Sequence, residues 1–289
     1  MNRRDFITRT LVAAGAVAVN PFPYDLLAGT EKKYANDRIK LGPMQVDVSR
    51  MAMGTGTSGV GGSSNQTRKL GLSGLADLLV EAYDHGVTFW DSADQYGTHP
   101  HLKEALNHVP REKIQILTKT HATTEEEMRA DLDRFRKELG TDYIDIMLLH
   151  LMTAENWPEI KKGAMNVISE AREEGIIRTH GVSCHSLPAL KTASKTDWVQ
   201  VDLARLNPAG VSMDDDVETV VSVLQDMKTA GKGVIGMKVF GAGRLTNRID
   251  ECLQYQFSAD VTDTFTIGVE NKDQLQDLLK RIPAASARV

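Results

Sequence analysis

Four residues between positions 91 and 150 could together perform acid–base chemistry on a carbonyl group: Asp91, Tyr96, Lys119 and His150. A phenol has a pKa of about 10, too high for it to release a proton easily at neutral pH. A neighbouring lysine would stabilise the phenolate and lower that pKa, and a carboxylate would keep the lysine charged and in place. A histidine beside them would orient the carbonyl oxygen. The four side chains therefore predict a proton-relay site for carbonyl reduction or alcohol oxidation.

Each residue also has an ordinary structural explanation when it is taken alone. An aspartate can cap a helix, a tyrosine before a glycine can pack in a loop, a lysine at a strand end can be solvated, and a histidine can be half-buried in the core. The catalytic hypothesis therefore depends on elements that bring all four residues to one place.

From Val46 onward, short apolar runs alternate with amphipathic stretches. The runs predict strands at Arg50–Gly54, Thr88–Asp91, Ile114–Thr118, Tyr143–Leu149, Thr179–Ser183, Trp198–Leu203, Val234–Lys238 and Thr264–Val269. The spacing predicts helices at Leu75–His85, Thr124–Leu139, Trp157–Glu173, Asp215–Ala230 and Lys272–Arg281. Glycines follow four of these helices, as left-handed C-caps do, at Gly86, Gly140, Gly175 and Gly231.

Eight strands separated by helices in roughly 250 residues predict a (β/α)8 barrel. The apolar runs lack strict alternation, which indicates strands buried on both faces of a parallel sheet. A doubly wound open sheet is the alternative, but the glycines at Gly54, Gly56 and Gly59 are not followed directly by a helix and make a weak dinucleotide fingerprint. In a barrel, polar residues at the carboxyl ends of the strands converge on one face.

The composition argues against some classes of binding partner and site. The chain has 289 residues, a formal net charge of −5 and two cysteines, Cys184 and Cys252. The charge gives no reason to expect nucleic acid as a partner, and two cysteines cannot form a disulfide framework. No apolar run reaches the roughly 18 residues of a membrane span, so we expect no stable span after processing.

The N-terminus predicts an export signal. Adjacent arginines, Arg3 and Arg4, precede Phe6 and a mild apolar stretch, which is the pattern of a twin-arginine (Tat) signal. We expect residues 1–36 to be signal and linker and residues 37–289 to be the barrel. The expected partner during export is the twin-arginine translocase and the expected location is the periplasm.

The chain resembles the aldo-keto reductase superfamily. The resemblance runs from Ile39 to Ile282 and rests on Asp91-Ser92-Ala93, Tyr96-Gly97, Leu117-Thr118-Lys119 and a stretch ending in Leu148-Leu149-His150. It implies a (β/α)8 barrel of aldo-keto reductase type, with a short or missing C-terminal loop, that reduces an aldehyde or ketone with NADPH or NADH. Tyr96 would be the acid, Lys119 and Asp91 its tuning pair and His150 the orienting group.

The resemblance also implies cofactor positions. Ser183, Cys184 and Gln200 stand where the family holds the nicotinamide carboxamide, although a thiol substitutes poorly for the usual amide. Met237 stands where an aromatic residue often stacks on the nicotinamide, and Lys238 follows it. The small-residue loop beneath the pyrophosphate would be formed by Gly241, Gly243 and Arg244.

Cofactor choice stays open at this stage. Glu270 and Asn271 fall where members that prefer NADPH carry phosphate-binding residues. A carboxylate there would repel a 2′-phosphate and suit a ribose diol, while Lys272 would partly compensate. Glu270 is equally explained as a surface residue at a helix start.

Two other function classes compete. A metal-dependent barrel hydrolase would need clustered imidazoles, for which His99, His101, His180 and His185 are available. A non-catalytic nucleotide-binding barrel would need none of the four acid–base residues. The proposed catalytic set uses no metal.

Overall fold

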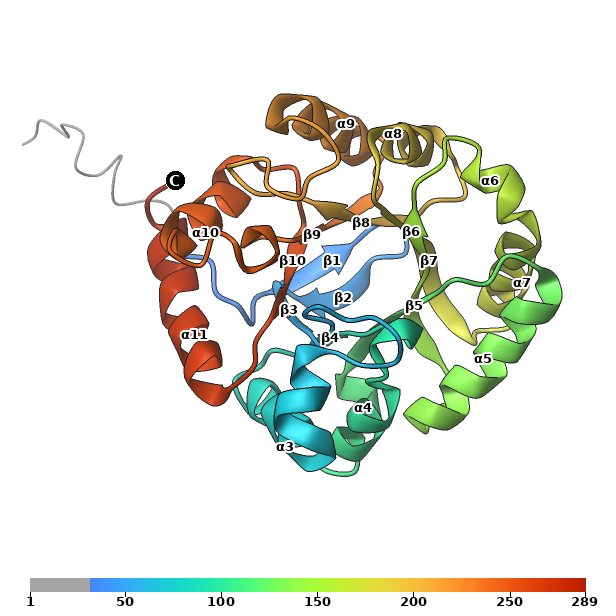
Figure 1. The fold of residues 1–289 in the computed structure, drawn as a ribbon, viewed down its shortest axis with the longest axis horizontal. Coiled ribbons are helices and arrows are strands. Elements are labelled where there is room, and N and C mark those ends of the chain that lie inside the picture. The colour runs from blue at the N-terminus through green and yellow to red at the C-terminus, as the bar shows by residue number, and fades with distance from the viewer. Residues whose placement is uncertain (1–31) are drawn as a thin grey trace, which may run out of the picture. The chain divides into compact units, whose positions relative to one another are not determined.

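The computed structural model describes residues 32–289, which form a closed barrel of eight parallel strands (Figure 1). Strand neighbours around the ring follow the chain order, and β10 closes the ring against β3. The strands are β3 (Met51–Gly54), β4 (Phe89–Asp91), β5 (Gln115–Thr120), β6 (Ile144–Met152), β7 (Ile177–Cys184), β8 (Val201–Arg205), β9 (Gly233–Met237) and β10 (Thr264–Gly268). The predicted (β/α)8 barrel is confirmed.

Helices surround the ring of strands in Figure 1. They are α3 (Asn65–Asp84), α4 (His99–Leu106), α5 (Glu125–Leu139), α6 (Trp157–Ile160), α7 (Lys162–Glu173), α8 (Leu187–Lys195), α9 (Val217–Thr229), α10 (Ile249–Ser258) and α11 (Lys272–Ser286). Helix α5 shows how the sequence sets such ends: Thr124 and Glu127 form a capping box at its start, and Gly140 ends it in the left-handed conformation. No helix among residues 32–289 is long and apolar enough to cross a membrane.

Alternation along each strand decides which side chains reach the barrel interior. On β6, Ile146 and Leu148 belong to the apolar cluster inside the barrel, while Met147 and Leu149 pack against the helices. His150 continues the inward series at the carboxyl end of the strand. The same alternation applies to every strand, so only one side chain in two can face the barrel mouth, which we define as the carboxyl ends of the eight strands.

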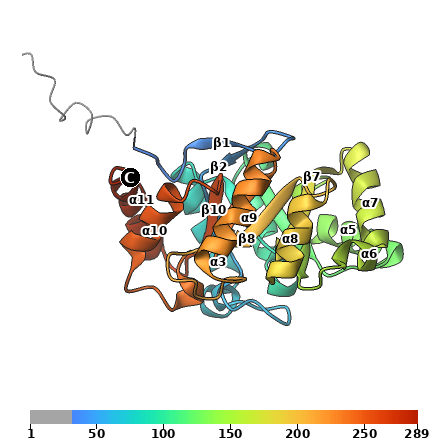
Figure 2. The same cartoon turned by 90° about the horizontal axis from the view of Figure 1, so that it is seen from above.

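A hairpin that the sequence analysis did not predict closes the opposite end of the barrel, here called the floor. Strands β1 (Arg38–Leu41) and β2 (Val46–Ser49) pair in antiparallel fashion. Figure 2 shows this hairpin on one side of the barrel and the loop that follows β3 on the other. Leu41 and Val48 are buried within the apolar cluster inside the barrel.

The boundary of the barrel lies slightly before the predicted one. Ala35 is buried, its carbonyl accepts a hydrogen bond from Met51 N, and the N–H of Lys33 donates to Ser286 Oγ at 2.9 Å. Residues 33–36, predicted to be linker, therefore pack as part of the barrel. The predicted twin-arginine signal lies in residues 1–31, outside the described residues.

Candidate active site

Three neighbouring strands carry the four predicted catalytic residues to the mouth. Asp91 ends β4, Lys119 lies near the end of β5 and His150 near the end of β6. Tyr96 ends the short helical turn η1 (Asp94–Tyr96), which follows β4 directly. Because β4, β5 and β6 are adjacent in the ring, the four side chains converge.

Lys119 is buried and held in a charged pair. Its Nζ forms an ion pair with Asp91 Oδ1 and donates to the Ser92 carbonyl at 2.7 Å. The other carboxylate oxygen of Asp91 accepts from Thr266 Oγ1 at 2.8 Å. Burial favours the neutral amine, but the Asp91 carboxylate and Tyr96 together outweigh it and raise the pKa of Lys119. Lys119 is therefore a fixed positive charge at neutral pH.

Tyr96 lies against this charge and beneath a glycine-rich loop. Lys119 Nζ is 4.9 Å from the centre of the Tyr96 ring. A Cβ atom on Gly56 or Gly59 would approach the ring to 2.2 or 2.3 Å, so only glycine lets this loop lie on the phenol. The glycines after β3 thus cover Tyr96, and no dinucleotide turn is formed there.

Burial raises the pKa of the Tyr96 phenol, and the opposing attraction of Lys119 does not cancel this effect. The expected net lowering of the Tyr96 pKa by Lys119 is therefore wrong for the protein without ligands. Burial is the larger effect because it withdraws water from the phenolate, whereas the charge of Lys119 is shared with Asp91.

His150 faces Tyr96 as a neutral imidazole. The two ring centres are 5.7 Å apart in an edge-on arrangement, and His121 stacks on the other side of His150 at 4.7 Å. Burial, followed by the charge of Lys119, lowers the pKa of His150 far below its ordinary value. His150 Nδ1 is buried and has no partner among residues 32–289. A neutral ring with an unused nitrogen is suited to a hydrogen bond with a ligand.

An irregular backbone presents His150. The β6–β7 register shifts between Leu149 and Met152, and Leu151 adopts φ +64°, a left-handed conformation that is rare for a residue other than glycine. Ser183 Oγ accepts the Leu151 N–H at 2.9 Å. Bulges of this kind re-aim side chains next to active sites. Ser183 thus supports the turn that directly follows His150.

The β9 side of the mouth holds five of the predicted cofactor residues. Met237 ends β9 inside the barrel, and Lys238 follows it with φ +56°. Gly241 and Gly243 both have positive φ values, and Arg244 Nε donates to the Gly241 carbonyl at 3.4 Å. These residues lie together at the same end of the barrel as Tyr96.

Two predicted carboxamide ligands do not face the mouth. Cys184 points outward into the core between the strands and the helices, where its thiol meets the buried Asp202 carboxyl. Gln200 precedes β8, because that strand begins at Val201 and not at the predicted Trp198; its Oε1 accepts from Thr179 Oγ1 at 2.8 Å near the floor. Of the three residues predicted to bind the carboxamide, only Ser183 lies at the mouth.

The residues predicted to meet the 2′-phosphate already bond to other groups of this chain. Glu270 forms an ion pair with Lys69 and accepts from Asn65 Nδ2 at 2.7 Å, both on α3. Asn271 caps α11, its Oδ1 accepting from Gln274 N at 2.9 Å. Lys272 pairs with Glu81 at 2.7 Å and does not compensate Glu270. The basic residue that faces Glu270 thus comes from α3.

The histidines proposed for the competing metal site are separated. His99 uses both ring nitrogens, on Glu138 Oε2 and Thr118 Oγ1, each at 2.7 Å. His180 lies on the outward face of β7 against Trp198. Among residues 32–289, no three His, Cys, Asp or Glu side chains are arranged to hold a metal ion.

Comparison with known proteins decides the family. Residues 51–284 match the model of the "Aldo/keto reductase family". The chain belongs to the aldo/keto reductase family. The match covers all eight barrel strands, and with them the four acid–base residues.

Curated proteins with similar sequences are also named as reductases. The chain is 30% identical to "Probable aldo-keto reductase 1" of Glycine max over 55% of this chain and 51% of that protein. It is 26% identical to the "NADH-specific methylglyoxal reductase" of Escherichia coli over 50% of this chain and 51% of that protein. The chain thus spans about half the length of these curated relatives.

Solved structures of aldo-keto reductases share the fold of this chain. The holo form of an aldo-keto reductase from Bacillus halodurans has a TM-score of 0.69 at 19% identity, covering 87% of this chain and 91% of that one. The aldo-keto reductase of Bombyx mori in complex with NADP has a TM-score of 0.61 at 18% identity, covering 85% and 86%.

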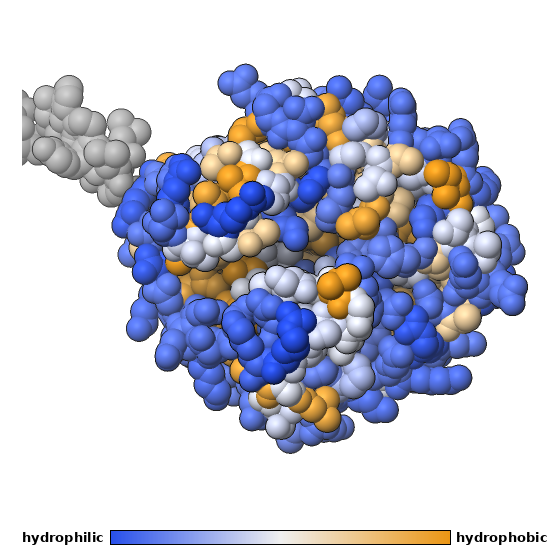
Figure 3. Space-filling view, in the orientation of Figure 1, coloured by the Kyte–Doolittle hydropathy of each residue, from blue (hydrophilic) through white to orange (hydrophobic). Residues whose placement is uncertain are grey.

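The structure adds residues to the mouth that the sequence analysis did not select. They are His121, Arg205 and Thr266, from three different strand ends or loops, and His185, considered above only as a metal ligand, joins them. The sequence did contain an indication for Arg205. It follows Val201 and Leu203 in the alternating set of residues that face the barrel interior, and it is a charged residue at the end of a strand. The surface over the strand ends is hollowed in Figure 3.

Proposed function

We propose that this chain reduces an aldehyde or a ketone with NADH or NADPH, or runs the reverse oxidation, with Tyr96 as the proton donor. The observation that carries the proposal is the convergence of Tyr96 with the buried Lys119–Asp91 pair and the neutral His150 at the mouth. Membership of the aldo/keto reductase family supports the same chemistry.

Each of the four residues at the mouth has its own role in the proposed reaction. The raised pKa keeps Tyr96 protonated, so the phenol is loaded with the proton that the carbonyl oxygen needs. As that proton leaves, Lys119 stabilises the phenolate, and Asp91 keeps Lys119 charged and in position. His150 supplies a second hydrogen bond that orients the carbonyl oxygen. A reduced nicotinamide bound at this mouth would supply the hydride.

The residues present fit such a nucleotide on one side of the mouth better than on the other. The loop of Gly241 and Gly243, both with positive φ, suits the pyrophosphate. Met237 provides an apolar surface for the ring. Ser183 would contact the carboxamide, and Lys69 beside Glu270 would decide between a ribose diol and a 2′-phosphate.

The deciding experiment uses Tyr96→Phe, which removes only the phenolic oxygen. We expect reduction of methylglyoxal by NADH or NADPH to fall by about 100- to 10,000-fold, because the acid is lost. Binding of both nucleotides, followed by quenching of tryptophan fluorescence, should be unchanged. Full activity in the variant would refute the role of Tyr96, and absence of nucleotide binding in the wild type would favour the non-catalytic barrel.

We further propose that the protein is exported through the twin-arginine route. The adjacent Arg3 and Arg4, with Phe6 and the apolar stretch after them, support this proposal. Replacing both arginines by lysine should leave the protein in the cytoplasm of a cell that otherwise exports it, as cell fractionation would measure. Equal distribution of variant and wild type would contradict it.

A further inference from the structure

The β8–β9 side of the mouth carries an arginine that the proposed acid–base chemistry does not use. Arg205 is the last residue of β8, and Val201 and Leu203 before it pack inside the barrel. The alternation therefore turns Arg205 inward, and its Cα pairs with that of Met237 on β9. Its side chain is 15% exposed, so it reaches the solvent of the mouth.

The buried Asp214 carboxylate holds the Arg205 side chain in place but binds only some of its N–H donors. Arg205 Nε donates to Asp214 Oδ1 at 3.0 Å, and Nη2 bonds to the same oxygen. The Asp214 side chain is fully buried. A guanidinium has five N–H donors in a planar fork. Nη1 has no acceptor among residues 32–289, so donors are left for a ligand.

Lys238 adds a second cation beside Arg205. It directly follows Met237 in a left-handed conformation and is half-buried, and no carboxylate among the described residues pairs with it. Burial lowers the pKa of Lys238, and the charges of Arg205 and Lys119 lower it further. The Asp91 carboxylate opposes these effects, but no carboxylate among the described residues forms an ion pair with the amine.

Among residues 32–289, the carboxylates around these cations leave Lys238 without an ion pair. Asp91 is engaged by Lys119 and Asp214 by Arg205. Burial, followed by the charges of Arg205 and Lys238, lowers the pKa of His185 to about 3, so this histidine is neutral. Of the three cations Lys119, Arg205 and Lys238, only Lys238 thus has no ion pair among the described residues.

Resting on the proposed function, we propose that Arg205, supported by Lys238, recognises an oxyanionic group of the substrate, so that the preferred substrates are aldehydes or ketones that carry a carboxylate or phosphate. The planar fork of Arg205 matches a two-oxygen anion in geometry, which a lysine alone does not. Asp214 positions the fork. The same chemistry could be supplied by the pyrophosphate of the nucleotide, and the experiment separates the two sources.

The experiment compares ω-oxo acids of two to six carbons with their methyl esters, which keep the carbonyl and remove the charge. We expect wild-type kcat/KM to favour at least one acid over its ester by about tenfold or more. In Arg205→Gln/Asp214→Asn, which removes both charges and leaves no buried unpaired carboxylate, that ratio should fall to about one while the Kd of the nucleotide is unchanged. Lys238→Met should lower the ratio to a smaller extent.

A matched control removes an ion pair elsewhere. Arg129 on α5 is exposed and pairs with Glu170 at 2.6 Å, so Arg129→Gln/Glu170→Gln makes the same change in charge and should leave the ratio unchanged. A ratio that survives in Arg205→Gln/Asp214→Asn would overturn the inference. An equal loss for acid and ester, caused by weaker nucleotide binding, would also overturn it and assign the anion to the pyrophosphate.

A second readout does not depend on turnover. Glutarate, a saturated dicarboxylate, should bind the wild-type protein in calorimetry and fail to bind Arg205→Gln/Asp214→Asn, while the control pair binds as the wild type does. If no carbonyl compound is reduced but this pattern holds, the proposed function fails and the anion site stands. Equal glutarate binding by wild type and variant would overturn the site.

Discussion

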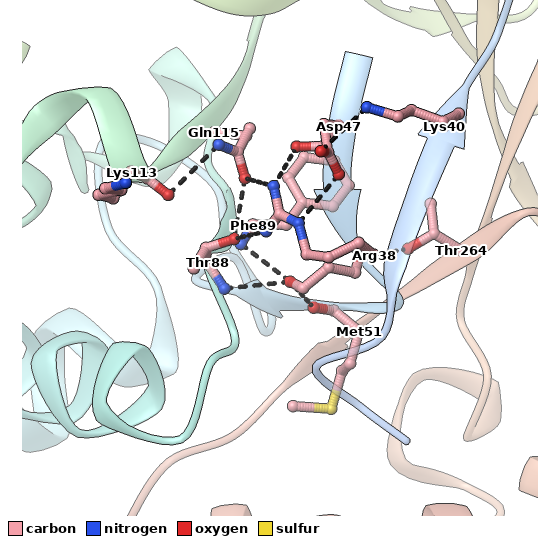
Figure 4. Close-up of polar contacts among 10 residues, drawn as sticks. Arg38, Lys40, Asp47, Met51, Thr88, Phe89, Lys113, Gln115 and Thr264 are labelled. Atoms are coloured by element: carbon pink, nitrogen blue, oxygen red, sulfur yellow. Dashed lines mark hydrogen bonds and ion pairs between the residues drawn. The ribbon is translucent and has the colours of Figure 1, made fainter. Parts of the chain in front are cut away.

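The two ends of the barrel treat their polar groups in opposite ways. At the floor, Arg38 is bonded to Asp47 and Thr88, and Ser49 Oγ donates to the Met51 carbonyl while accepting from the N–H groups of Thr88 and Phe89 (Figure 4). At the mouth, buried nitrogens of His150 and His185 have no partner among residues 32–289. The polar groups of Arg38 and Ser49 at the floor have partners within the chain, whereas these imidazole nitrogens at the mouth are free to bind a ligand.

The floor also has a hollow in its surface. A cavity of ≈ 1150 Å³ opens at the floor, lined by Arg38, Arg178 and other residues of the hairpin and nearby loops. Arg38 pairs with Asp47 at 2.9 Å and Arg178 with Asp145 at 3.0 Å. These charges have their partners already, so we place the proposed chemistry at the mouth, where other barrels of this type have their active sites.

The largest expected effect comes from breaking the buried pair of the mouth. Lys119→Met leaves Asp91 as a buried charge without its cation, which should lower the free energy of unfolding by roughly 3–5 kcal/mol and abolish activity. Lys119→Met/Asp91→Asn should recover most of the stability and none of the activity. Urea unfolding and NADPH oxidation measure the two. Recovery of activity in the double variant would show that Lys119 only supports the fold.

The next effect concerns Asp202, directly behind the mouth. Burial raises the pKa of Asp202 to about 8, from the ordinary value of 3.8. The folded protein then holds this proton more tightly than the unfolded chain, so the stability it supports is full near pH 4 and is lost as the pH rises to 8. Asp202→Asn should remove this loss, on the order of several kcal/mol. Thermal unfolding of both proteins at pH 5 and pH 8 checks it; parallel changes would contradict it.

A smaller effect is expected where Ser183 supports the backbone after His150. Ser183→Ala removes the acceptor for the Leu151 N–H and should cost about 1 kcal/mol of stability. It should also lower kcat, because His150 loses part of its orientation. Leu151→Gly, which fits the left-handed backbone without a Cβ, should not lower stability through backbone strain. Unchanged kcat in Ser183→Ala would separate the bulge from catalysis.

The smallest effect should come from the floor. Arg38→Met removes a partly exposed ion pair with Asp47 and a bond to Thr88, so we expect a loss of about 1 kcal/mol or less and an unchanged kcat/KM. Chemical unfolding and steady-state kinetics test this. A substantial loss of activity would mean that the two ends are coupled, and the contrast between them would then fail.

Most of the barrel could be predicted because the strand signals are local. Each of the eight predicted strands overlaps an observed one, and Gly86, Gly140, Gly175 and Gly231 all have positive φ values. The hairpin at the floor was not predicted, because its short runs resemble the chain that leads into the first barrel strand. The linker boundary was set a few residues late for the same reason.

The sequence by itself determined the fold class and that Asp91, Tyr96, Lys119 and His150 lie at one end of it, since residue type and position at a strand end are local properties. The tertiary structure decided which side chains face inward: a strand that starts three residues later leaves Gln200 at the floor. One step of alternation turns Cys184 outward, and the charges of Arg205 on β8 and Lys119 on β5 both act on Lys238 because the sheet closes into a barrel. The direction in which a side chain points, its burial and its pKa all depend on neighbours that are distant in the chain. Only the closed barrel brings those neighbours together.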